Sequence, residues 1–319
     1  RGIPASFRKM HFYGEHTFSF YNKENQRVWC KFHFRTQQGI ENFTNEQAAE
    51  INAQDREYMG KDLFDSIENG DFPKWNMYVQ IMTEDQAKAH YENPFDITKV
   101  WSQKEFPLMQ VGVLELNRNP ENYFAEVEQA AFTPAHVVPG IGFSPDRFLQ
   151  GRLFSYGDAQ RYRLGVNYNH IPVNRAKVEV NEFHRDGFMR TDGNYGRTPA
   201  YTPNSEGYWT AQPEAIEPPL DIEGAMWRYD PNDDPSDDNF RAGGNLWRIL
   251  PEDKKELLIK NIAADIAPVT ENIKYRQAVH CYWADPEYGE RATKAMGLSM
   301  EKMLELAKLD HKGLIQATL

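Results

Sequence analysis

A tyrosine between two arginines is the feature of this sequence with the clearest chemical meaning. In the stretch RLFSYGDAQRYRLG at 152–165, Tyr156 follows Arg152 by four residues and precedes Arg163 by seven. On a helix, residues four apart are neighbours, and a guanidinium beside a phenol favours the ionised form that can bind Fe(III). The same spacing also fits an ordinary half-buried tyrosine with an arginine stacked beside it. Spacing alone leaves both interpretations open.

The residues before Tyr156 predict the helix that carries it. Ser144 is a favourable N-cap, Pro145 suits the first helical position, and Asp146 suits the first turn. We therefore expect a helix from residue 145 onward. Its shared face is expected to be made by Phe148, Leu149, Leu153 and Tyr156.

The first part of the chain has the pattern of an antiparallel sheet. Residues 15–35 alternate apolar and polar side chains around a turn rich in Asn, Lys and Glu, which predicts a hairpin. Residues 44–71 predict two short helices, because Thr44 and Gln47 match a capping box and Gly70 can end the second helix. Further elements are expected as strands at 76–83 and 109–120, with a short helix near 84–91.

The chain divides into three regions of different composition. We expect sheet with helical insertions over 1–118, an irregular proline-rich arm over 119–238 and a helical domain over 239–319. Prolines in the arm disfavour both helices and hydrogen-bonded strands. Its many tyrosine and tryptophan side chains instead favour an extended segment that packs across its own fold or a sister subunit. The last region repeats apolar residues at helical spacing. The expected fold class is therefore α+β.

Composition argues against several classes of function. The net charge of -11 disfavours nucleic acid and anionic membranes, which bind through Lys and Arg. No apolar run in the sequence approaches the length of a membrane span. The two cysteines, Cys30 and Cys281, form no metal-binding or disulfide pattern, which favours a reducing compartment. The sequence ends in QATL and not in a peroxisomal S-K-L tripeptide, which favours a bacterial cytoplasm. The ligand is expected to be a small molecule.

Longer stretches resemble the haem catalases, in the small-subunit branch that binds NADPH. The most specific is FSPDRFLQGRLFSYGDAQRYRLGVNYNHIPVN, which resembles the segment that carries the proximal haem ligand. The resemblance continues through RGIPASFRKMHFYGEHTFSFYN, VWCKFHFRTQQGI, LNRNPENYFAEVEQAAFTPAHVVPGIGFSPD, HRDGFMRTDGNYG and DPEYGERA. It implies the second half of an antiparallel catalase-type β-barrel with helical insertions, an extended wrapping arm and a C-terminal helical domain.

The resemblance also implies a reaction and its proximal residues. The implied enzyme disproportionates hydrogen peroxide to water and dioxygen through a Tyr-ligated Fe(III) haem b, as a cytoplasmic homotetramer. Tyr156 takes the position of the axial iron ligand, and Arg152 that of the arginine that keeps it ionised. Asp146 and His16 match the next members of a charge chain that runs back from this arginine.

Other positions match residues that bind the haem edge and a nucleotide. Arg163 takes the place of an arginine that pairs with a haem propionate, and Phe132 that of an aromatic residue near the ring. The positions implied for NADPH are Arg1, His33, Arg35, Val100 and Trp101. The chain departs from the family pattern at one position near this site, because Gln103 stands where the family often has a further histidine.

The distal side of the haem is expected to come from sequence outside these 319 residues. The family supplies it with a histidine and an asparagine, and none of the nine histidines here has the required context. We therefore expect the C-terminal portion of a catalase, working with the N-terminal half of the same protein. Two alternatives stay open: a catalase-fold haem-binding module without peroxide turnover, and a catalase-like enzyme acting on lipid hydroperoxides.

Overall fold

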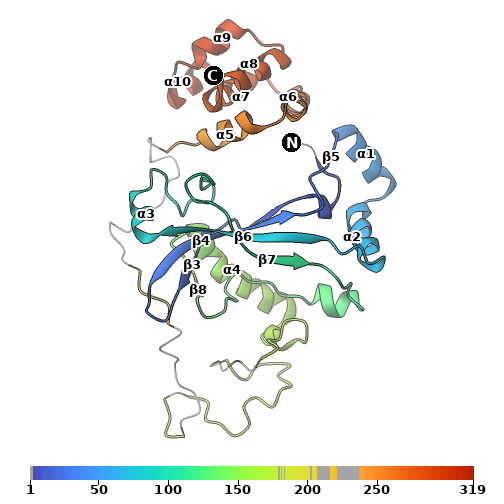
Figure 1. The fold of residues 1–319 in the computed structure, drawn as a ribbon, viewed down its shortest axis with the longest axis vertical. Coiled ribbons are helices and arrows are strands. Elements are labelled where there is room, and N and C mark those ends of the chain that lie inside the picture. The colour runs from blue at the N-terminus through green and yellow to red at the C-terminus, as the bar shows by residue number, and fades with distance from the viewer. Residues whose placement is uncertain are drawn as a thin grey trace.

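An antiparallel sheet forms the centre of the computed structural model, which describes residues 3–178, 180, 182, 184–201, 203–206, 216–220 and 237–319. The strand order is β7-β6-β4-β3-β8, with β2 also paired to β4, and β1 pairs with β5 in a separate ribbon. The strands are β1 (Ile3–Pro4), β2 (Phe12–Tyr13), β3 (Phe18–Tyr21), β4 (Arg27–Thr36), β5 (Asn42–Phe43), β6 (Lys74–Thr83), β7 (Met109–Glu115) and β8 (Ile141–Gly142). Figure 1 shows β4, β6 and β7 crossing the middle of the molecule.

The predicted hairpin and the next strand are confirmed. β3 and β4 pair from Phe18↔Cys30 to Tyr21↔Arg27, and β4 pairs with β6 along nearly its whole length. The strand predicted at 109–120 is too long, since β7 ends at Glu115. The segment that follows includes Asn-Arg-Asn-Pro, which has low strand propensity, and a proline cannot donate to a ladder.

The helices predicted between these strands are present. They are α1 (Asn45–Gln54), α2 (Tyr58–Glu68) and α3 (Glu84–Ala89). Thr44 and Gln47 form the predicted capping box at α1, because the Thr44 hydroxyl accepts from the Gln47 amide and the Gln47 side chain accepts from the Thr44 amide. Gly70 follows α2 with φ of +77°, a left-handed conformation that glycine adopts without strain.

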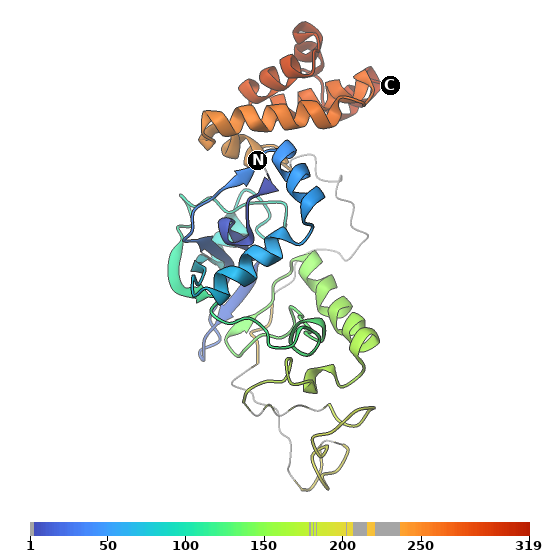
Figure 2. The same ribbon diagram turned by 90° about the vertical axis from the view of Figure 1, so that its right-hand side faces the viewer.

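Short turns and one long helix make up most of the regular structure in the described part of the predicted arm. These elements are a π-helix at Phe124–Glu128, α4 (Arg147–Leu164) and a 3-10 turn at Tyr168–His170. A further 3-10 turn, at Phe7–Lys9, lies outside the arm, near the start of the chain. Figure 2 shows α4 below the sheet, with the loops that follow it farther away.

One segment of the arm returns to the sheet. The Glu217 carboxylate accepts from the Phe143 amide at 3.0 Å, while Arg27 donates to the carbonyls of Pro218 and, at 3.3 Å, Pro219. Gly142 leaves the space that this carboxylate occupies, since a Cβ there would lie 2.5 Å from Glu217 Oε1.

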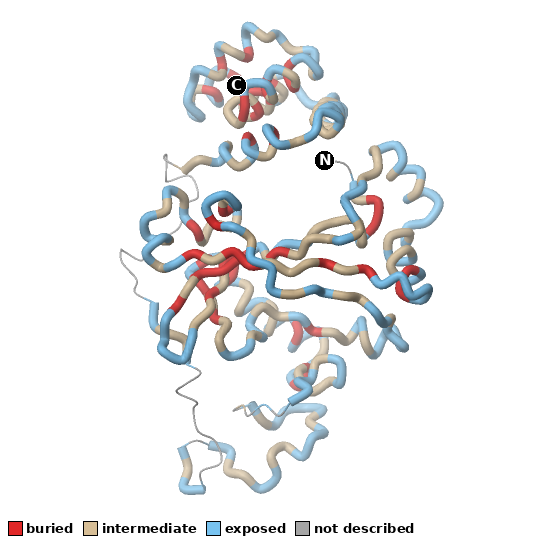
Figure 3. Tube along the Cα trace, in the orientation of Figure 1, coloured by how far each residue is buried: buried red, intermediate tan, exposed pale blue. Residues whose placement is uncertain are grey.

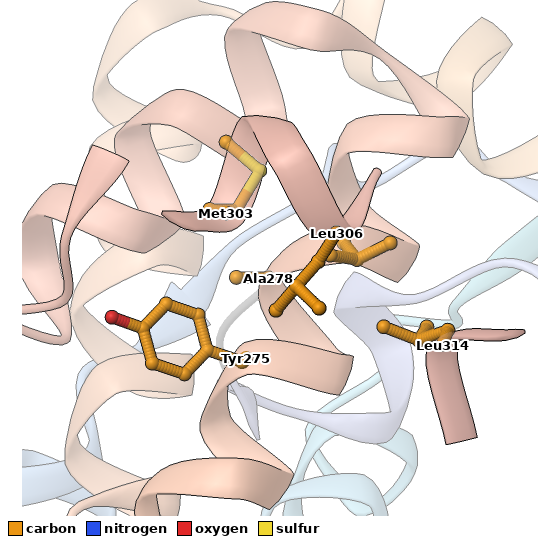
Figure 4. Close-up of a cluster of buried hydrophobic side chains, with 6 residues drawn as sticks. Tyr275, Ala278, Met303, Leu306 and Leu314 are labelled. Carbon is orange, nitrogen blue, oxygen red and sulfur yellow. The ribbon is translucent and has the colours of Figure 1, made fainter. Parts of the chain in front are cut away.

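The last region is a bundle of helices with its own core. Its helices are α5 (Arg241–Ile249), α6 (Glu252–Ile266), α7 (Glu271–Ala284), α8 (Pro286–Ala295), α9 (Met300–Leu306) and α10 (His311–Ala317). Figure 3 shows buried positions gathered between these helices, and Figure 4 shows the side chains that meet there from α7, α9 and α10. The buried cluster is Tyr275, Ala278, Val279, Met303, Leu306 and Leu314. Among the helices in the described residues, none combines the length and the apolarity that a bilayer crossing requires.

A second core lies against the sheet. Trp29 of β4 and Met82 of β6 pack with Trp101 and Phe106 from the loop between α3 and β7, and all four are at least nine-tenths buried. Large apolar side chains at these positions stabilise the fold through burial, by about 1.5–3 kcal/mol each. This packing fixes the loop that carries Trp101 against β4.

Candidate functional site

Asp146, and not Ser144, caps the helix that carries Tyr156. The carboxylate of Asp146 accepts the amides of Phe148 at 2.9 Å and Leu149 at 3.1 Å, and α4 begins at Arg147. The prediction of Ser144 as the cap was wrong because its hydroxyl donates instead to the backbone carbonyl of Thr17. A carboxylate at this position also meets the positive end of the helix dipole.

Only part of the predicted apolar face of α4 is buried. Leu149 is fully buried and Tyr156 is half-buried, whereas Phe148 is 54% exposed. Phe154, on another side of the helix, is 78% exposed. The only fully buried residue of the predicted face therefore lies in the first turn of the helix.

A continuous hydrogen-bonded chain connects Tyr156 to Asp146. Arg152 Nη2 donates to the Tyr156 hydroxyl oxygen at 2.9 Å, and Arg152 Nη1 lies 2.7 Å from His16 Nε2. His16 Nδ1 in turn lies 2.6 Å from Asp146 Oδ2. The structure thus brings together all four residues of the predicted charge chain, although His16 and Asp146 are 130 residues apart.

The geometry assigns the proton on His16. A guanidinium only donates hydrogen bonds, so His16 Nε2 must accept from Arg152. The proton then sits on Nδ1 and is donated to Asp146, which makes His16 a neutral imidazole held between a cation and an anion. His16 is 2% exposed and Asp146 is 1% exposed, so water does not compete for these contacts.

Arg152 also stacks on the ring that it bonds. Its guanidinium carbon lies 4.8 Å from the centre of the Tyr156 ring. The stacked arrangement of an ordinary tyrosine is therefore present together with the charge-assisted hydrogen bond. An isolated stacked pair would lack the further contacts from Arg152 to His16 and from His16 to Asp146.

Arg163 lies farther along α4 and donates to uncharged acceptors. It donates to the carbonyls of Glu128 and Ala130, each at 2.7 Å, and to the Gln160 side chain. Gln160 donates to the carbonyl of Phe132, whose ring is 80% exposed. Gln160, which follows Tyr156 on α4, therefore connects Arg163 with the backbone of Phe132.

The residues predicted for the nucleotide form a separate group on β4 and the adjoining loop. His33 is buried, and its Nε2 lies 2.8 Å from Gln80 Oε1. Burial lowers the pKa of His33, because a charged imidazole is poorly solvated there. Arg35 donates to the side chain of Gln103 at 2.7 Å. Within the described part of the chain, His33 Nδ1 and Arg35 Nε are buried without a hydrogen-bond partner.

The two other described members of this group differ in exposure. Trp101 is 1% exposed and donates its indole N–H to the Pro94 carbonyl at 3.2 Å, whereas Val100 is 64% exposed. Arg1 lies outside the described residues.

Comparison with known proteins decides the family. The sequence profile of the catalase family, described as "Catalase", matches residues 1–208. The chain belongs to the catalase family. A second profile, "Catalase-related immune-responsive", matches residues 233–296 of the helical region.

Curated catalases from bacteria are similar to this chain over most of its length. The catalase of Staphylococcus haemolyticus is 54% identical over 306 residues, which are 94% of this chain and 60% of the relative. The catalase of Aliivibrio fischeri is 53% identical over 302 residues, covering 95% of this chain and 62% of the relative. The chain thus spans about three fifths of the length of these relatives.

Solved structures confirm the α+β catalase fold. Catalase A from Saccharomyces cerevisiae matches with a TM-score of 0.83 and 39% identity, over 92% of this chain and 61% of that one. A bacterial catalase matches with a TM-score of 0.82, also at 39% identity, over 92% and 60%.

Residues that the sequence analysis of this catalase-family chain did not single out lie beside the site. Thr17 follows His16, accepts from Ser144 through its carbonyl, and donates through its hydroxyl to the Pro94 carbonyl at 2.7 Å. Lys31 of β4 lies 5.4 Å from the Trp101 ring. A lysine on the same strand face as Trp29 and His33 was a visible signal, because β4 was predicted as a strand and alternate residues share a face.

Proposed function

We propose that this chain binds haem through Tyr156 and belongs to an enzyme that disproportionates hydrogen peroxide to water and dioxygen. The observation that supports the proposal best is the chain Tyr156–Arg152–His16–Asp146. When bound, the haem iron supplies the redox chemistry by which one peroxide is reduced and another is oxidised. The residues of the chain supply the ligand and its electrostatic environment.

The donor set suits a ferric haem. Tyr156 offers a phenol oxygen, a side-chain ligand that haem iron accepts in proteins, and Arg152 holds this oxygen in place by donating an N–H to it. The guanidinium of Arg152 only donates hydrogen bonds, and its contact with His16, which in turn contacts Asp146, restricts its orientation. The exposed ring of Phe132 offers an apolar surface of the kind that a porphyrin face buries. Arg163, which donates to uncharged acceptors, is the cation proposed for a haem propionate.

The proposal includes the finer features implied by the family. We propose haem b as the cofactor, a homotetramer as the assembly and the cytoplasm as the location. We also propose that the distal histidine and asparagine come from sequence outside these 319 residues. NADPH is proposed for the group of His33, Arg35, Val100 and Trp101, with Arg1, and the buried unpartnered nitrogens of His33 and Arg35 support a polar ligand there.

Titration with haem tests the ligand. We expect the wild-type chain to form a Soret band, and Tyr156→Phe to lose the ferric spectrum of tyrosine ligation. Tyr162→Phe is the matched control, because Tyr162 lies on the same helix and is 96% exposed. An identical iron spectrum in wild type and Tyr156→Phe would refute the ligand assignment.

Oxygen release from peroxide by the haem-loaded protein tests the reaction. The protein assayed must include the sequence proposed to supply the distal histidine and asparagine; if that haem-loaded protein shows the tyrosine spectrum but releases no oxygen, the haem-binding module is favoured. Turnover of lipid hydroperoxides in preference to hydrogen peroxide would favour the lipid hydroperoxide enzyme. Pyridine haemochromogen spectra identify the haem type, and light scattering gives the subunit number.

A further inference from the structure

Ser144 is a buried side chain that bridges two distant segments beside the site. The residue is 3% exposed, and both of its hydroxyl's partners, Thr17 and Asp146, are 1% exposed. The Ser144 hydroxyl donates to the Thr17 backbone carbonyl and accepts the Asp146 amide at 3.3 Å. One hydroxyl therefore connects the backbone just after His16 with the residue that caps α4.

The pairing of β3 with β8 explains why the bridge lies at this residue. The two strands pair antiparallel, with Ser19 opposite Gly142, and β8 ends there. Continuing this register by two residues along each segment places Thr17 opposite Ser144. At that position the donor to the Thr17 carbonyl is the Ser144 hydroxyl, so a side chain continues the cross-connection beyond the end of the strand.

Ser144 is also held on its helix side. Its backbone carbonyl accepts from the Gln150 side chain in the first turn of α4 at 2.9 Å. The hydroxyl thus connects the start of α4 with a segment that lies 127 residues earlier in the sequence. Because water is excluded from both hydrogen bonds of the hydroxyl, their loss would leave buried backbone groups without these partners.

The bridge spans the contact between His16 and Asp146. His16 directly precedes the carbonyl that Ser144 bonds, and Asp146 provides the amide that Ser144 accepts. The two side chains meet with His16 Nδ1 2.6 Å from Asp146 Oδ2, a separation that a shift of either backbone would lengthen. While His16 Nδ1 donates to Asp146, Nε2 stays the acceptor for Arg152.

We propose that Ser144 is a positioning residue, whose hydroxyl sets the separation of His16 from Asp146 and through it the orientation of Arg152. This inference rests on the proposed function, because its consequence is the orientation of the guanidinium at Tyr156, the proposed iron ligand. The hydroxyl acts through backbone contacts on both sides, so its hydrogen bonds, and not the volume of the side chain, carry the effect.

NMR of the haem-free chain, labelled with ¹⁵N at its histidines, tests the His16 contact directly. We expect a far-downfield proton on His16 Nδ1, because it is donated over 2.6 Å to a carboxylate. The variant His16→Gln assigns this signal by its loss. In Ser144→Ala the proton should move upfield and exchange with water about tenfold faster, the ratio that corresponds to the loss of one hydrogen bond.

Two further variants separate the hydroxyl's effect on His16 from a general structural role. Ser66→Ala is the matched control, because Ser66 of α2 is 7% exposed and its hydroxyl also donates to a backbone carbonyl, that of Asp71. This variant should leave the His16 signal unchanged. Ser144→Thr keeps a hydroxyl and should retain the wild-type signal.

Electron paramagnetic resonance of the haem-loaded protein tests whether the effect reaches the iron. Hydrogen bonds to an axial ligand influence the electronic state of haem iron, so a displaced guanidinium at Tyr156 should alter the ferric signal. We expect this change in Ser144→Ala and the wild-type signal in both Ser144→Thr and Ser66→Ala.

The outcomes are distinct. An unaltered His16 proton or ferric signal in Ser144→Ala would overturn the proposal, as would the same changes in Ser66→Ala or Ser144→Thr, or a wild-type chain without the downfield proton. If Ser144→Ala does not fold, Ser144→Cys decides, since its thiol is a weaker donor and acceptor and should produce a smaller change in the same direction. A failure of the proposed function appears separately, as an iron spectrum that Tyr156→Phe does not alter.

Discussion

Asp146 joins the start of α4 to His16, with its Oδ2 2.6 Å from His16 Nδ1 and its Oδ1 accepting two helix amides. One buried carboxylate thus performs two tasks, helix capping and orientation of an imidazole that lies 130 residues away in sequence. The two tasks can be separated by experiment, because Asp310 also caps a helix, α10, through its side chain and so provides a reference for the capping task.

Replacing Asp146 should therefore cost more than replacing an ordinary cap. Asp146→Ala removes the cap, worth about 1 kcal/mol, and leaves a buried imidazole N–H without an acceptor, worth about 1–3 kcal/mol. The control is Asp310→Ala, since Asp310 caps α10 by accepting from the Gly313 amide at 2.7 Å. We expect urea unfolding to show about 2–4 kcal/mol of lost stability at Asp146 and about 1 kcal/mol at Asp310. Equal losses would contradict the second task.

Lys31 makes the stability of the protein depend on pH in a defined direction. The folded pKa of about 8 lies below the unfolded value of 10.5, so the folded state disfavours the charged lysine. The cost is fully present below the folded pKa and disappears as the pH rises toward the unfolded pKa. Between about pH 7 and pH 10, wild type should gain on the order of 2–3 kcal/mol relative to Lys31→Met. A constant difference between the two proteins in chemical unfolding across this range would rule this out.

Gly142 should not tolerate a side chain. A Cβ at this position would approach Glu217 Oε1 to 2.5 Å and Ser19 Oγ to 2.7 Å, so Gly142→Ala must displace the carboxylate that holds the Phe143 amide. We expect a loss of about 1–3 kcal/mol in unfolding free energy, the usual cost of overpacking. Gly112→Ala in β7 is the control, because nothing lies within 4 Å of its added Cβ. Similar stabilities for the two variants would show that Glu217 yields without cost.

Local sequence determined much of the secondary structure of this chain. The capping box of Thr44 and Gln47, the stop after α2 and the β3–β4 hairpin all depend on residues close together in the chain, so the pattern predicts them directly. The spacing of Arg152 and Tyr156 likewise predicted that the two meet on one helix face. Family resemblance added His16 and Asp146, which no local pattern connects.

Only the tertiary structure decided how those residues are joined. Whether Ser144 or Asp146 caps α4 depended on the Thr17 carbonyl, which the sheet brings to Ser144 from a distant segment. The proton position on His16, the uncharged acceptors of Arg163 and the burial of Lys31 against Trp101 also depend on long-range packing. Hydrogen bonds and burial act over a few ångströms in space, whereas helix and strand propensities act over a few residues in sequence. The sequence therefore predicts the helices and strands, and the fold determines which residues are in contact.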